Sequence, residues 1–123
     1  GALYVSDPKY NVDMFMGIGG GPEGVLAASA LDSYECHFQG RFIFDNEKDI
    51  QQANSMGIKD LDKKYELSEI VKGDSIFCAT GITDSSFIKG ITFDQDKYIS
   101  ETLITHKNTN YKQLVKNVNS INE

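Results

Sequence analysis

The stretch "DMFMGIGGGPEGVLAASAL" (Asp13–Leu31) decides how this sequence folds. An apolar run, Asp13–Gly17, leads into a turn rich in glycine, and small and apolar residues follow it. We predict a short buried strand over Asp13–Gly17 and a helix that begins near Pro22, where proline needs no partner for an N–H group. Glycine-rich turns between a strand and a helix usually bind phosphate, so this turn also predicts an anion site.

Glu23 puts a negative charge in the first turn of that helix, where a phosphate would be repelled. A structural explanation exists, because a carboxylate there stabilises the helix dipole by ~0.3–1 kcal/mol. The glycines still need a reason, since each one adds to the entropy lost on folding. A divalent cation between the carboxylate and the phosphate removes the repulsion. We therefore predict that Glu23 binds Mn²⁺ or Mg²⁺ and that the backbone of Gly19, Gly20 and Gly21 orients a phosphate or its sugar.

Two alternatives use the same turn. Gly19, Gly21 and Gly24 match the spacing G-x-G-x-x-G, and Asp45 follows at about the distance of the ribose-binding acid in a dinucleotide-binding domain. Glu23 counts against that domain, because it would repel the pyrophosphate. The other alternative is a non-catalytic module in which the glycines only allow the helix to pack closely on a sheet.

The rest of the chain alternates strands with helices and then turns to strands. The predicted elements are a strand at Gly40–Asp45, a helix at 46–57 capped by Asn46, helical turns at 67–73, a buried strand at 75–82, a turn or short helix at 83–90, and strands at 91–94, 98–106 and 111–118. The last of these could also be a helix. The alternation in the first half predicts a single α/β domain over residues 1–123, with a parallel or mixed sheet and flanking helices.

Composition excludes several classes of partner. The net charge of −6 argues against nucleic acid and against an anionic membrane surface. No apolar stretch approaches the ~20 residues that span a bilayer. Cys36 and Cys78 indicate free buried thiols in a reducing cytoplasm. Because the chain has no initiator methionine and reaches its first predicted strand early, we expect a piece of a longer chain that continues on the N-terminal side.

Three more residues are candidates for the phosphate site. Arg41 is the only arginine, and its guanidinium group suits bidentate phosphate contacts. Thr80 and Asp84 follow a predicted strand, at an edge where open α/β sheets bind ligands. For all three we favour a structural explanation, which is a solvated charge for Arg41 and turn hydrogen bonds for the other two.

Four motifs, in order along the chain, resemble those of the class II (bacterial-type) fructose-1,6-bisphosphatases. They are "VDMFMGIGGGPEGVLAASAL" (Val12–Leu31), "QGR" (Gln39–Arg41), "MGI" (Met56–Ile58), and "ATGITD" with "KGI" (Ala79–Asp84 and Lys89–Ile91). By this resemblance Glu23 is the glutamate that binds the metal, and Gly20 contacts the sugar phosphate through its backbone. Gly21 stands where the family usually has alanine.

The resemblance implies the C-terminal part of a sugar phosphatase with an inositol-monophosphatase-like fold. Its reaction is the hydrolysis of the 1-phosphate of fructose 1,6-bisphosphate with Mn²⁺ or Mg²⁺, in the gluconeogenesis of a bacterial cytoplasm. The expected partners are the sugar bisphosphate, the N-terminal part of the same enzyme, and further copies in a homo-oligomer. The other acidic metal ligands belong to that N-terminal part, so we expect this chain alone to be inactive. No nucleophile or general base is assigned within these residues.

Overall fold

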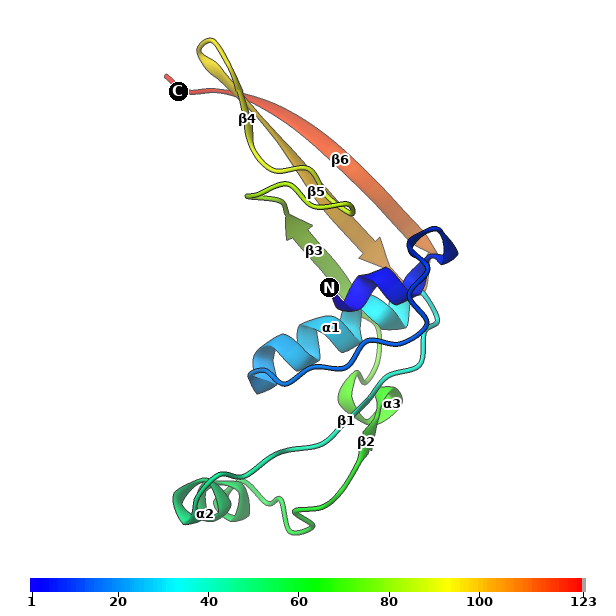
Figure 1. Cartoon of the computed structure of the whole chain (residues 1–123), viewed down its shortest axis with the longest axis vertical. Helices are drawn as coiled ribbons and strands as arrows, with labels where there is room; N and C mark the ends of the chain where they lie inside the picture. The colour runs from blue at the N-terminus through cyan, green and yellow to red at the C-terminus, as the bar shows by residue number, and fades with distance from the viewer. Residues whose placement is uncertain (123) are drawn as a thin grey trace.

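The structure is a computed structural model that describes residues 1–122. The helices are η1 (Ala2–Ser6), η2 (Pro8–Tyr10), α1 (Gly21–Ser33), α2 (Glu47–Ser55) and α3 (Leu67–Ile70), and the strands are β1 (Gln39–Gly40), β2 (Tyr65–Glu66), β3 (Ile76–Thr80), β4 (Thr92–Asp94), β5 (Lys97–His106) and β6 (Tyr111–Ser120). Figure 1 shows β3, β5 and β6 side by side, with α1 across one end of this sheet and α2 well away from it. No helix in this part of the chain is both long and apolar enough to cross a membrane.

Helix α1 anchors the core. It begins at Gly21 with Pro22 in its first turn, so the predicted helix start is confirmed. Its buried residues lie in its C-terminal half: Ala28, Ala30, Leu31, Asp32 and Ser33. The hydroxyl group of Thr105 in β5 donates a buried hydrogen bond of 3.0 Å to the Ser33 hydroxyl. Small side chains on α1 therefore let the helix lie directly on the sheet.

The larger sheet is antiparallel throughout, with β5 in the middle. β6 pairs with β5 along its whole length, and β3 and β4 pair with the other edge of β5. The predicted parallel or mixed sheet is therefore wrong for the described residues, whereas the flanking helices are present. The reason is local, because the short turns around Gln95 and Asn110, which both have positive φ, join β4, β5 and β6 as hairpins. The final segment, Tyr111–Ser120, is a strand and not the alternative helix.

Two predicted strands do not form in this structure. Asp13–Gly17 belongs to no helix or strand, and of the predicted strand at Gly40–Asp45 only Gly40 is paired, next to Gln39 in β1. Most of their apolar side chains find little surface to pack on within residues 1–122, and Met16, for example, is 83% exposed, although the Phe42 ring packs against Phe44 and Tyr65. An apolar pattern predicts that a segment becomes buried, but the described residues supply few packing partners for these two segments.

The cysteine prediction needs a similar correction. Both thiols are free, but Cys78 is exposed and Cys36 is only half-buried, so neither is a core residue. Cys78 lies in β3, which forms as predicted but alternates between exposed and half-buried residues because only one of its faces is covered. Partial burial raises the pKa of the Cys36 thiol.

The predicted helix at 46–57 is confirmed as α2, and its ends follow from local chemistry. The Asn46 side chain accepts a hydrogen bond of 3.0 Å from the backbone N–H of Asp49, as an N-cap residue does. Gly57 follows the helix with a φ of +88°, a conformation that favours glycine. The helical turns predicted at 67–73 are present as α3.

The loop between β3 and β4 gives a first prediction. Its Gly90 is buried, and a methyl group added there would lie 2.7 Å from the backbone carbon of Thr83 and 2.8 Å from the backbone nitrogen of Asp84. We expect Gly90→Ala to destabilise the fold by about 1–3 kcal/mol, as overpacking usually does. Thermal unfolding followed by circular dichroism measures this effect. Gly24→Ala is the control, because a methyl group there meets nothing within 4 Å. Equal melting temperatures for the two variants would contradict the prediction.

Candidate functional site

The candidate site is built at the N-terminal end of α1. Gly20 is the N-cap residue, with φ −68° and ψ 154°, and no side chain caps the first turn. The first intrahelical bond runs from the Gly24 N–H to the Gly20 carbonyl, at 3.1 Å. The backbone N–H groups at the start of a helix have no partner inside the helix, and the helix dipole adds positive charge there. This end of α1 is exposed and therefore offers free donors to an anion.

The Glu23 side chain folds back over the backbone of Gly20. A methyl group placed on Gly20 would overlap the Glu23 Oε2 atom and lie 3.3 Å from Cδ. At Gly19 and Gly21, by contrast, an added methyl group meets nothing within 4 Å. Gly20 is thus the one glycine of the turn whose missing side chain makes room for the carboxylate. Gly20 and Glu23, two of the predicted site residues, are therefore neighbours in the structure.

A metal site needs more ligands than this end of the helix provides. Glu23 is exposed, and no hydrogen bond or ion pair within residues 1–122 occupies its carboxylate. A free carboxylate is the hard oxygen ligand that Mg²⁺ and Mn²⁺ prefer. Across the same residues, no group of three or more His, Cys, Asp or Glu side chains could hold a metal ion. Glu23 is therefore suited to bind a divalent cation, but the described residues supply only this one ligand and the others must come from elsewhere.

The other three candidates lie elsewhere. Arg41 is exposed just after β1. The Thr80 hydroxyl shares a hydrogen bond of 2.8 Å with the Thr102 hydroxyl of β5, and the Asp84 carboxylate accepts the backbone N–H of Gly90 at 2.9 Å. These bonds give Thr80 and Asp84 a structural role. No bond among the described residues joins any of the three to Glu23.

The dinucleotide alternative lacks its structural context in residues 1–122. Such a domain requires a strand before the glycine turn and a second, parallel strand that ends at Asp45. Here no strand precedes Gly19, and Asp45 lies in an irregular segment before α2. All of the strand pairs described are antiparallel.

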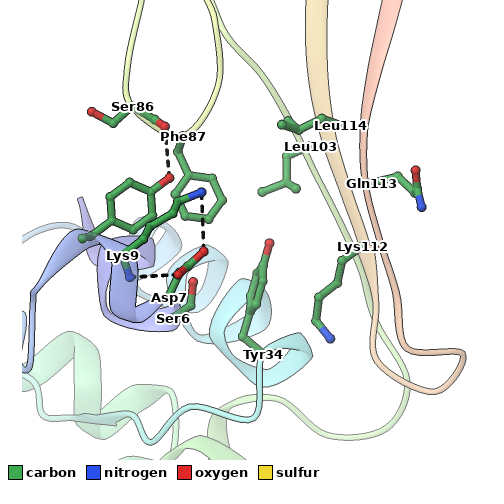
Figure 2. A pocket seen from close by; sticks show the side chains of 11 residues that line it. Ser6, Asp7, Lys9, Tyr34, Ser86, Phe87, Leu103, Lys112, Gln113 and Leu114 are labelled. Carbon is green, nitrogen blue, oxygen red and sulfur yellow. Dashed lines mark hydrogen bonds and ion pairs between the residues drawn. The ribbon is translucent and has the colours of Figure 1, made fainter.

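The structure also contains a cavity of about 390 Å³ that the sequence did not indicate. It lies at the opposite end of α1 from Glu23, between η2, Tyr34 and the strands β5 and β6 (Figure 2). The rings of Tyr10 and Phe87 stack in its wall, with centroids 5.5 Å apart. Burial raises the pKa of the Tyr34 hydroxyl group there. Its walls come from segments far apart in the sequence, so no local motif could reveal it.

Comparison with known proteins identifies the family. The family model described as bacterial fructose-1,6-bisphosphatase, glpX-encoded, matches residues 1–121 and so continues through β5 and β6, beyond the last motif. The D-fructose 1,6-bisphosphatase class 2/sedoheptulose 1,7-bisphosphatase of Prochlorococcus marinus (strain AS9601) is 36% identical over 103 residues, which cover 72% of this chain and 31% of that protein. The protein of the same name from strain MIT 9515 is 37% identical with the same coverage. The chain thus spans about a third of the length of the curated relatives it matches. It belongs to the bacterial, class 2 fructose-1,6-bisphosphatase family.

Proposed function

We propose that this chain is the C-terminal part of a metal-dependent phosphatase that hydrolyses the 1-phosphate of fructose 1,6-bisphosphate. Family membership supports the reaction class, and the relatives' names supply the substrate. The observation that carries the proposal is the free Glu23 carboxylate lying over Gly20 at the start of α1. In this proposal the chain is one α/β domain of an inositol-monophosphatase-like sugar phosphatase fold. We call the complete enzyme the longer protein in which this chain follows an N-terminal part.

In this proposal Glu23 binds the metal and the glycine turn binds the sugar phosphate. Glu23 holds Mn²⁺ or Mg²⁺ together with carboxylates of the N-terminal part. When bound, the cation supplies charge neutralisation for the transferred phosphoryl group and activation of the attacking water. The backbone N–H groups of Gly19–Gly21 donate to oxygens of the sugar phosphate, which the positive end of α1 attracts. Gly20 keeps the space over its backbone open for the Glu23 carboxylate.

The proposal also covers the remaining candidate residues, the assembly of the enzyme and its substrates. Arg41 has an exposed guanidinium group and is the second candidate for a phosphate contact, whereas Thr80 and Asp84 hold their loop and strand in place. The enzyme works as a homo-oligomer in gluconeogenesis in the bacterial cytoplasm. Its relatives' names include a sedoheptulose bisphosphatase, so both sugar bisphosphates are test substrates.

Gly20→Ala in the complete enzyme tests the proposal directly. The backbone angles of Gly20 suit any residue, so the fold should tolerate the change. The new methyl group displaces the Glu23 carboxylate, and we expect kcat/KM for fructose 1,6-bisphosphate to fall by about tenfold or more, because catalysis depends on preorganised charge. Gly21→Ala is the matched control, since that position is open. Phosphate release is measured at several Mn²⁺ and Mg²⁺ concentrations. Equal activity of the two variants would contradict the role of Gly20.

A further inference from the structure

The leading segment, Asp13–Ile18, has no backbone partner in this structure. It lies between η2 and α1 and belongs to neither helix nor strand. Within residues 1–122, residues 12–19 make no backbone hydrogen bond. Backbone N–H and C=O groups in folded proteins nearly always find a partner, in secondary structure, a side chain or water. A run of this length without protein partners is open to pairing with another strand.

Apolar side chains occur on both of its faces, three on one face and Phe15, between Asp13 and Gly17, on the other. In an extended segment Met14, Met16 and Ile18 share one face, and they are 73%, 83% and 88% exposed. On the other face the Phe15 ring lies against Gly17, yet Phe15 is still 53% exposed. A strand that is apolar on both faces is typical of the interior of a sheet covered on both sides. An exposed apolar group of this kind marks an interaction surface.

We infer that the leading segment is an inner strand of a sheet in the complete enzyme, paired on its edges with strands of the N-terminal part. This inference rests on the proposed function in taking the chain as part of a longer enzyme. The relatives leave ample chain for the purpose, because this chain covers only 31% of their length. A second copy of the chain fits less well, since a two-fold pairing supplies one strand at one edge and leaves the other edge bare.

The position of the leading segment connects the inference to the metal site. The segment continues through Gly19–Gly21 directly into α1, which carries Glu23. Strands that pair with it would end beside the same glycine turn, where open α/β sheets place their ligands. Residues 1–122 bring no three metal-binding side chains together, and carboxylates of the N-terminal part would reach Glu23 by this route. Strand pairing would then assemble the site from two parts of one chain.

Hydrogen exchange of the complete enzyme, resolved to the amides of Met14–Ile18, tests the inference. We expect these amides to exchange at least about 100-fold more slowly than those of an unstructured chain, because paired strands open rarely. Exchange at the unstructured rate would overturn the inference. Protection that disappears on dilution to a monomer would also overturn it, because the partner would then be a second copy.

A pair of proline variants supplies the control. Met16→Pro removes one N–H group and should abolish the protection of the neighbouring amides in the leading segment. Asn108→Pro lies in the turn Lys107–Asn110 between β5 and β6, at the position where turns favour proline, and should leave the protection unchanged. The wild-type measurement stands even if Met16→Pro fails to fold. If the amides are protected but the enzyme has no phosphatase activity, the inference holds and the proposed function is rejected. If the enzyme is active but the amides are not protected, the proposed function holds and the inference is rejected.

Discussion

The 123-residue chain alone should release no phosphate from fructose 1,6-bisphosphate above the uncatalysed rate, with or without Mn²⁺ or Mg²⁺. The expected loss is the whole enzymatic acceleration, which is typically at least about 10⁶-fold. The reason is the count of ligands, because Glu23 is a single carboxylate and residues 1–122 hold no group of three metal-binding side chains. Phosphate release is measured over hours at high protein concentration.

The control for this experiment is the complete enzyme, assayed at the same molar concentration. Circular dichroism of the isolated chain shows whether its helices and strands have formed, so that an unfolded preparation is not mistaken for an inactive one. Turnover by the isolated chain at an enzymatic rate would mean that it contains a site of its own. The assignment of the other ligands to an N-terminal part would then be wrong.

Glu23→Gln in the complete enzyme should lower turnover by roughly a hundredfold at modest metal concentration, as the loss of one electrostatic contact to the transition state does. The amide keeps the size and shape of the carboxylate but removes its charge, so metal binding should weaken by about tenfold or more. Added Mn²⁺ or Mg²⁺ should restore part of the activity. The melting temperature should change little, because the lost interaction with the helix dipole is at most ~1 kcal/mol.

Glu47→Gln is the matched control for this variant. Glu47 also lies in the first turn of a helix, α2, and is exposed like Glu23. The same amide substitution therefore removes the same kind of dipole interaction without touching the glycine turn. If the two variants had equal activity and an equal metal requirement, Glu23 would be reduced to a residue that stabilises a helix start.

Local chemistry explains which parts of the fold could be predicted. The N-cap at Asn46, the proline at the start of α1 and the positive φ of Gly57 are encoded within a few residues, and all three were predictable. The pairing of strands was not, because β3 meets β5 across more than twenty residues of chain. The predicted strand at Asp13–Gly17 shows the limit of apolar patterns, which indicate a need for cover without naming what provides it.

The candidate site divides in the same way. Glu23 could be found from sequence because its charge conflicts with a phosphate-binding turn, and that conflict is visible in a few letters. The contact between its carboxylate and the Gly20 backbone required the structure, since it depends on how one side chain folds back. The cavity beside Tyr34 is lined by five separate segments of the chain, and no pattern within any one of them signals it.

The contact between Gly20 and Glu23 also bears on how such a sequence can change over generations. A side chain larger than hydrogen at position 20 claims space that the carboxylate at position 23 already fills. The cost of a change at either position therefore depends on the residue at the other, and the two substitutions are not additive. The overlap is with the end of an exposed, flexible side chain, so the fold would tolerate alanine at position 20 but the Glu23 carboxylate would have to leave this position. A lineage that depended on this placement of the carboxylate would therefore keep glycine at position 20, whereas one that lost Glu23 would be free to fill the space.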